Sequence, residues 1–216
     1  MRKFLFVLLL IPLQFFSQSD TNFGWLPKIN LSSRIASEIK WVNSIEVREV
    51  LFDEEYQFTH NLLDVSSIVS FKTNLNQSFN IGYIVRFDKK ETVHRFVQQY
   101  NFIGNINSLK LAHRLGFEQH FPSKSKSFYR ARYRATLQKP LNGEKVDVKE
   151  FYVKLGNEYV YNFTDENLEI RVSPYLGYRL SEKDKLEFGL EYRGSSLVDE
   201  FNKHRLWLRT TWYISL

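Results

Sequence analysis

Apolar and polar residues alternate through most of this chain, in about ten segments separated by short polar loops. A period of two places successive side chains on opposite faces of an extended strand, and no segment shows the helical period of 3.6 residues. The alternation is cleanest in residues 203–216, where Leu208, Trp212, Ile214 and Leu216 share the apolar face. The pattern predicts an all-β protein in which each strand neighbours the next along the chain.

The segments are about ten residues long, which matches the 9–11 residues that a tilted strand needs to cross a bilayer. Aromatic residues cluster near segment ends, as at Tyr100, Tyr159 and Trp212, and membrane barrels carry aromatic girdles there. We therefore expect residues 41–216 to form a single up-and-down antiparallel transmembrane β-barrel of about ten strands. Residues 20–40 are expected to be a lead-in segment or an additional strand. Counting them would make eleven strands and require a twelfth, so twelve is the alternative.

The start of the chain reads as a targeting segment. Met1, Arg2 and Lys3 begin with positive charge, residues 4–16 are apolar, and residues 17–19 are small or polar. The apolar run is shorter than the roughly 20 residues of a spanning helix. Residues 1–19 are therefore predicted to be a signal peptide, with a permanent membrane anchor as the weaker alternative.

Alternation alone does not say which face of the barrel points inward. In a soluble barrel the apolar side chains would fill the centre, whereas in a membrane barrel they would touch lipid. Strand length, the aromatic ends and the terminal amphipathic strand favour the membrane arrangement. It predicts Leu111, Ile170 and Leu208 on the outside and Arg132 and Arg171 on the inside.

An inward polar face would carry a network of charged side chains. Its sharpest part is the ladder at Arg130, Arg132 and Arg134, which alternates with Tyr and Ala residues. Opposite charges on neighbouring strands can neutralise one another. The ladder either braces the barrel or lines an anion site, because guanidinium groups grip carboxylate and phosphate. The candidate network is Arg114, Glu118, Arg130, Arg132, Arg134, Glu150, Lys154, Glu158 and Arg171.

The composition excludes several classes of binding and catalytic site. The chain has no cysteine, so it can form neither disulfides nor thiolate metal sites. Its formal net charge of +6 is spread over all segments, whereas a nucleic-acid binder would gather basic residues in one patch. No phosphate-binding loop, dinucleotide fingerprint or metal-ligand spacing occurs. We expect no cofactor, no metal and no nucleic-acid partner.

Several short segments together resemble the family called domain of unknown function 2490. This family comprises predicted outer-membrane β-barrel proteins of Gram-negative bacteria. The resemblance covers residues 41–216 and is carried by residues 109–114, 130–134, 140–145, 150–152, 157–158 and 212–213. It implies a barrel in the outer membrane of a Gram-negative bacterium. It implies no activity.

For function, the sequence favours a monomer with a structural role, or a narrow passage or binding site for small anions. Its expected partners are outer-membrane lipid and the barrel-insertion machinery, which would read Leu208, Trp212, Ile214 and Leu216 as an insertion signal. A lipid-modifying hydrolase is one alternative, but none of the histidines begins a His-x-Ser motif. A soluble periplasmic lipid-binding barrel is the other. Counting from the last strand, the loop at residues 140–146 should lie at the end of the barrel where the chain ends.

Overall fold

The computed structural model describes residues 21–53, 55–195 and 203–216, and these residues form eleven β-strands. The predicted signal peptide at residues 1–19 lies outside this range. Among the described residues, no helix is long and apolar enough to cross a membrane. The strands are β1 (Thr21–Ala36), β2 (Ile39–Asp53), β3 (Glu55–Asn74), β4 (Gln77–Asp88), β5 (Thr92–Ile106), β6 (Leu109–Pro122), β7 (Phe128–Pro140), β8 (Phe151–Asn162), β9 (Asn167–Arg179), β10 (Asp184–Ser195) and β11 (Lys203–Ser215).

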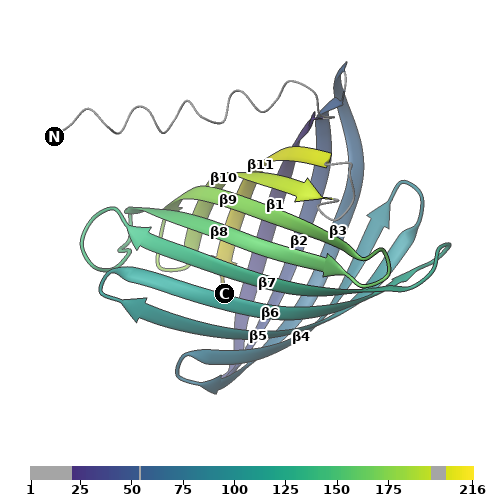
Figure 1. The fold of residues 1–216 in the computed structure, drawn as a ribbon. Helices are drawn as coiled ribbons and strands as arrows, with labels where there is room; N and C mark the ends of the chain where they lie inside the picture. Colours follow the sequence, from purple (N-terminus) through teal and green to yellow (C-terminus); the bar gives the residue numbers. More distant parts are fainter. Residues whose placement is uncertain (1–20, 54, 196–202) are drawn as a thin grey trace.

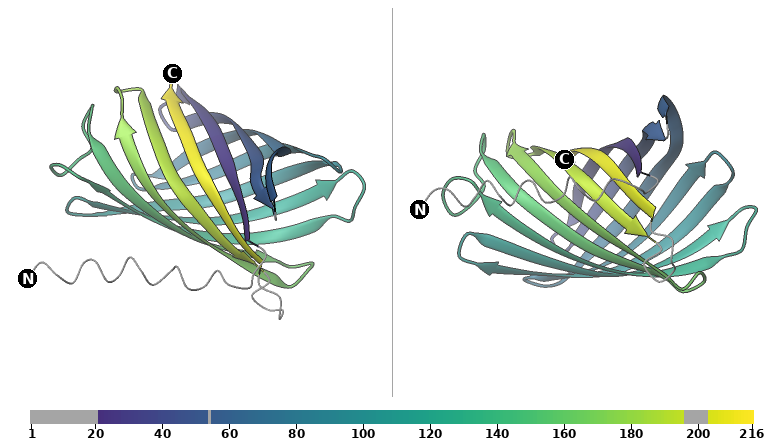
Figure 2. Two further views of the ribbon diagram at one scale, coloured as in Figure 1. Left: turned by 90° about the horizontal axis from the view of Figure 1, so that it is seen from above. Right: turned by 45° about the horizontal axis from the view of Figure 1, so that its top comes forward.

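The strands close into a barrel in which each pairs with its neighbours along the chain (Figure 1). These pairings are antiparallel, and the barrel is closed by a parallel pairing of β1 with β11. That seam runs in one register from Thr21 opposite His204 to Ser32 opposite Ser215, and Figure 2 shows the two strands side by side. Because every strand has a partner on both sides, the backbone hydrogen-bonding groups are satisfied without a free sheet edge along the seam.

The all-β barrel class is confirmed, and the strand number falls between the expected ten and the alternative twelve. Residues 20–40, expected as a lead-in or an additional strand, contain β1. An even number was expected because it places both chain ends on the same side of the membrane, as in bacterial outer-membrane barrels, where all strands pair antiparallel. Closure requires only that both edges be paired, and a parallel ladder meets that requirement as well.

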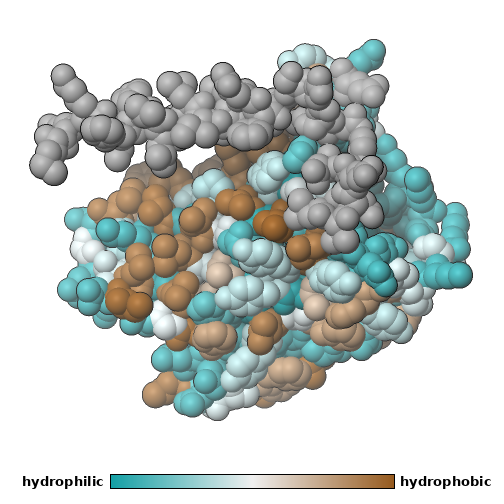
Figure 3. All heavy atoms as spheres, in the orientation of Figure 1, coloured by the Kyte–Doolittle hydropathy of each residue, from teal (hydrophilic) through white to brown (hydrophobic). Residues whose placement is uncertain are grey.

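The apolar faces of the strands point outward and the polar faces point into the barrel. On β11, Leu208 and Trp212 are 38% and 43% exposed, whereas Trp207 and Thr211 on the other face are 2% and 4% exposed. Arg132 and Arg171 face inward, where both make ion pairs. Figure 3 shows apolar residues gathered over the strands and polar residues toward the loops. The predicted orientation of the two faces is therefore confirmed.

The barrel has two rims. We call the one at which β11 ends the C-terminal rim; the connections β1–β2, β3–β4, β5–β6, β7–β8 and β9–β10 also lie there, since their strands run alternately up and down. The loop at residues 141–150 joins β7 to β8, so it lies at this rim as expected. It is held by backbone hydrogen bonds between Lys149 and Arg179 and between Glu150 and Arg179.

Candidate functional site: a basic vestibule above buried ion pairs

The centre of the barrel holds an arginine shared between two buried glutamates. Arg132 of β7 donates to Glu118 of β6 at 2.5 Å and to Glu158 of β8 at 2.9 Å. Arg134 and Arg171 also donate to Glu158, at 3.0 and 3.2 Å. The side chains of Glu118 and Glu158 are only 3% and 5% exposed, so their charges depend on these arginines for compensation.

A second group of ion pairs crosses the closing seam. Arg209 of β11 donates to Glu191 of β10 at 2.6 Å and to Glu46 of β2 at 2.9 Å. Arg193 also pairs with Glu191, and its guanidinium lies 5.6 Å from the centre of the Trp207 ring. A single arginine therefore links strands on both sides of the parallel seam.

A third group lies on the wall between the other two, on strands β3 to β5. Asp64 of β3 accepts two hydrogen bonds from Arg86 of β4 and one from Arg95 of β5, all at 2.8 Å. We call these three groups the ion-pair layer; its carboxylates are Glu46, Asp64, Glu118, Glu158 and Glu191.

The ion-pair layer closes this part of the lumen. The side chains of Arg86 and Arg132 are 20% and 21% exposed. Many other inward-facing residues at this level are only 0–5% exposed, whereas residues lining a wide water-filled channel would be exposed to water. They come from walls all around the barrel and include Leu26, Leu62, Arg95, Val97, Glu118, Glu158, Val160, Glu191, Arg193 and Trp207. Side chains therefore fill the interior at this level, as expected for a barrel of this size.

Between this layer and the C-terminal rim the interior is open and basic. We call this part the basic vestibule and define it by four inward-facing cations that are exposed: Arg34 of β1, Lys40 of β2, and Lys110 and Arg114 of β6. Arg114 donates to Asn101 at 2.7 Å, and none of the four has a carboxylate partner among the described residues. At the rim, a hollow of about 330 Å³ is lined by Arg34, Lys40, Ser32, Ser215 and Leu216. Unpaired like charges in a concave site attract anions.

The structure brings five residues of the predicted network together: Glu118, Arg132, Arg134, Glu158 and Arg171. Three others lie inside the barrel but make other contacts. Lys154 pairs with Glu187, Arg114 lines the vestibule, and the Arg130 guanidinium lies 4.9 Å from the centre of the Phe128 ring.

Glu150 does not belong to the network, and its inclusion was wrong. It precedes the first residue of β8 and accepts hydrogen bonds from the Asn142 side chain at 2.8 Å and the Asp147 backbone at 3.1 Å. These two hydrogen bonds, that from Asn142 first, lower the pKa of the Glu150 carboxyl. Glu150 was placed inside the barrel because the apolar–polar alternation of β8 extends one residue before Phe151, where the strand begins.

Sequence reasoning missed more than half of the residues in the ion-pair layer. Glu46, Asp64, Glu191 and Arg209 stand on polar faces, so alternation places them inside, but it does not show which charges on different strands meet. The contact of Arg209 with Glu46 in particular requires β1 to lie between β2 and β11.

The five histidines do not form a catalytic pair with serine among the described residues. On the outer surface, the side chains of His94, His113 and His204 hydrogen-bond to tyrosine hydroxyls at 2.5–2.8 Å. His60 contacts Glu49 at 2.8 Å, and His120 contacts Glu118 at 3.1 Å. In the described part of the chain, no group of three or more acidic or histidine side chains is placed to hold a metal ion.

Comparison with protein-family models shows the family to which the chain belongs. Residues 23–195 match the family described as "Protein of unknown function (DUF2490)", and the chain belongs to this family. The match begins earlier than the resemblance seen in the sequence and includes most of β1. No curated protein matches the chain.

Among solved structures, the chain is similar to an anion-selective porin from Comamonas acidovorans. The two share 10% sequence identity with a TM-score of 0.43. The similarity covers 80% of this chain and 55% of the porin. The chain thus spans about half of the porin's length.

Proposed function

We propose that this DUF2490 protein is an outer-membrane β-barrel of a Gram-negative bacterium that binds small anions in its basic vestibule. In this proposal it is a monomer surrounded by outer-membrane lipid. The apolar face of β11, with Leu208, Trp212, Ile214 and Leu216, serves as the insertion signal.

The outer surface supports the membrane location. Strands of 12–20 residues exceed the length needed to cross a bilayer. Large apolar side chains on the outer face are a third to a half exposed, for example Ile81, Leu155 and Phe188. A contiguous apolar surface of this kind is rare on soluble monomers, which disfavours the soluble periplasmic alternative. Extraction of the protein without detergent would contradict the membrane location.

The vestibule supports anion binding. Its four exposed cations have no carboxylate partners in the described residues, whereas the buried carboxylates of the ion-pair layer pair with arginines and Glu187 pairs with Lys154. Arg34 and Lys40 stand opposite each other in the β1–β2 register, so binding an anion there would relieve their repulsion without breaking an ion pair.

Calorimetric titration of the purified barrel with inorganic phosphate tests this proposal. The double variant Arg34→Gln/Lys40→Gln should bind phosphate at least about tenfold more weakly than wild type, because these two cations line the hollow at the rim. A matched control is Lys126→Gln, which removes an exposed charge from the loop between β6 and β7 at the other rim. Equal affinity in the double variant and the wild type would refute the vestibule as the site.

The ion-pair layer predicts that the protein binds anions without conducting them through the barrel. Because side chains fill the interior at that level, wild-type protein in planar bilayers should carry little or no steady current. A large, anion-favouring current would show that the layer opens and would make the chain a pore instead. The hydrolase alternative would gain support from lipid hydrolysis that is lost on substitution of one histidine.

A further inference from the structure

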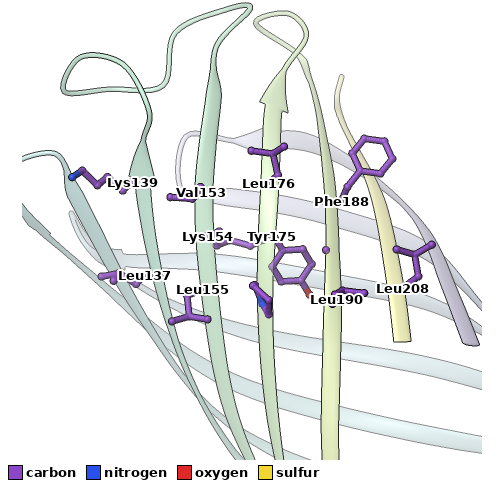
Figure 4. Close-up of a pocket in the computed structure, with 12 residues that line it drawn as sticks. Leu137, Lys139, Val153, Lys154, Leu155, Tyr175, Leu176, Phe188, Leu190 and Leu208 are labelled. Atoms are coloured by element: carbon purple, nitrogen blue, oxygen red, sulfur yellow. The ribbon is translucent and has the colours of Figure 1, made fainter. Parts of the chain in front are cut away.

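A groove of about 560 Å³ runs along the outer wall of the barrel across β7 to β11. Figure 4 shows its apolar side chains arrayed over these strands. It is lined by Leu137, Val153, Leu155, Pro174, Leu176, Phe188, Leu190 and Leu208, with Lys139, Lys154, Tyr175 and Gly189.

We attribute the groove to a proline, Pro174, on the outer face of β9. Two rows of outward side chains cross the strands, and Pro174 stands in one row next to Leu155. The short proline ring leaves a depression between larger side chains. Proline also lacks a backbone N–H, and the β9–β10 ladder lacks the pairs between Tyr175–Gly189 and Val172–Tyr192, while the register is the same on both sides of this gap. The floor of the groove therefore reaches the inward-facing Lys154 and Tyr175.

One cation stands at the end of this groove. Lys139 is exposed and pairs in register with Val153. The other outward positions of β7 are Tyr129, Ala131, Tyr133, Ala135 and Leu137, so the lysine breaks an uncharged face. It is followed by Pro140, the last residue of β7 at the C-terminal rim. A long lysine side chain near the end of a spanning strand can extend to the headgroup level.

We propose that this groove binds one acyl chain of an anionic phospholipid, whose phosphate is held by Lys139. The volume falls in the range of pockets that bind small molecules. The lining matches a hydrocarbon chain, and the lysine matches a phosphate at the chain's head. This inference rests on the proposed membrane location, but it concerns the outer wall and is independent of the vestibule.

The test is lipid retention measured by native mass spectrometry on barrel released from vesicles. The vesicles contain phosphatidylcholine and phosphatidylglycerol in equal amounts. Wild type should retain one phosphatidylglycerol in preference to phosphatidylcholine. Lys139→Gln should reduce that preference about fivefold, the effect of one lysine near a membrane surface, and Lys139→Arg should preserve it. Leu190→Trp, which fills the groove, should reduce retention of both lipids.

Lys145→Gln is the matched control, since it removes an exposed lysine from the loop at the same rim, outside the groove lining, and should leave retention unchanged. The altered gel mobility of the unheated protein reports whether each variant is folded. Equal retention of the two lipids by wild type, or unchanged preference in folded Lys139→Gln, would overturn the proposal. A barrel that enters vesicles but shows no preference refutes only the lipid site, whereas failure to enter vesicles refutes the membrane location and this inference with it.

Discussion

Arg132 is the residue on which the buried charges depend most. Among the described residues it alone forms ion pairs with both Glu118 and Glu158, so Arg132→Ala would leave Glu118 with His120 as its remaining described partner and weaken the compensation of Glu158. Removing one partner of a buried pair costs about 3–5 kcal/mol. The lower end applies here, because the arginine side chain is 21% exposed. Urea unfolding in lipid vesicles, followed by tryptophan fluorescence, measures the loss.

Arg114→Ala provides the comparison. This arginine also faces inward, but it is exposed and hydrogen-bonds to a neutral side chain. Its removal should change the free energy of unfolding by no more than about 0.5 kcal/mol. Equal destabilisation by the two substitutions would mean that the ion-pair layer does not stabilise the barrel.

The limits of sequence reasoning are clearest for these charges. Arg134 and Glu158 stand directly opposite each other in the β7–β8 register, and a pairing across these two strands was predictable. Arg209 and Glu46, in contrast, are 163 residues apart in the sequence. Their contact depends on barrel closure, which alternation does not specify.

At the scale of the strands, Gly177 of β9 stands where a side chain would collide with a buried tyrosine ring. A Cβ on Gly177 would lie 2.1 Å from Cζ of Tyr152, a ring that is 1% exposed and donates to Glu187 at 2.7 Å. Gly177→Ala should therefore displace the ring and destabilise the barrel by about 1–3 kcal/mol.

Gly156→Ala in β8 is the matched control, because a Cβ there would lie 3.6 Å from its nearest neighbour atom. It should unfold close to wild type in the same urea titration. A stability of Gly177→Ala equal to that of the control would show that Tyr152 can move without cost.

The loops at the rim opposite the C-terminal rim are joined by a pH-sensitive contact. Glu91, between β4 and β5, accepts hydrogen bonds from the Ser125 hydroxyl at 2.7 Å and from the backbone N–H groups of Lys124 and Ser125. These hydrogen bonds lower the pKa of Glu91, that from the Ser125 hydroxyl most. The contact is therefore complete above the ordinary glutamate value of about 4.3 and is lost as the pH falls through the lowered pKa.

Amide hydrogen exchange at Lys124 and Ser125 should accordingly show protection at pH 6 that disappears in acid. In Ser125→Ala the pKa returns toward its ordinary value, so protection at Lys124 should disappear at a higher pH than in wild type. Identical pH profiles in the two proteins would count against the hydroxyl as the main cause.

Period-two alternation located β2 to β11, but β1 was harder to recognise. Trp25, Leu26 and Pro27 form an apolar run without alternation. Leu26 faces inward and is fully buried, so an apolar residue stands on the inner face, where Lys28, Ser32 and Arg34 are polar. Ser33 then interrupts the outer face. The strand is specified by its two neighbours, which supply its hydrogen bonds, more than by its own pattern.

At the scale of the whole molecule, the parallel seam can be tested by cross-linking, since the chain has no native cysteine. Ile29 of β1 pairs with Trp212 of β11, so cysteines at these two positions lie one strand spacing apart, about 4.8 Å. Oxidation should join them and change the mobility of the protein on a denaturing gel.

The control pair is Ile45→Cys with Trp212→Cys. In the eleven-stranded barrel β1 separates these positions by two strand spacings, roughly 9.6 Å, which is too far for a disulfide. In a ten-stranded barrel β2 would lie beside β11 instead. Cross-linking of the control pair in preference to Ile29 and Trp212 would therefore overturn the seam.

Because β1 and β11 point the same way, Thr21 and Ser215 sit on opposite sides of the bilayer in the proposed orientation. A protease site placed just before β1 and another placed after Leu216 would then face different compartments. In intact cells, an added protease should cut one and spare the other. The two ends of the barrel also could not be joined by a tight turn, so this fold has no simple circular permutant.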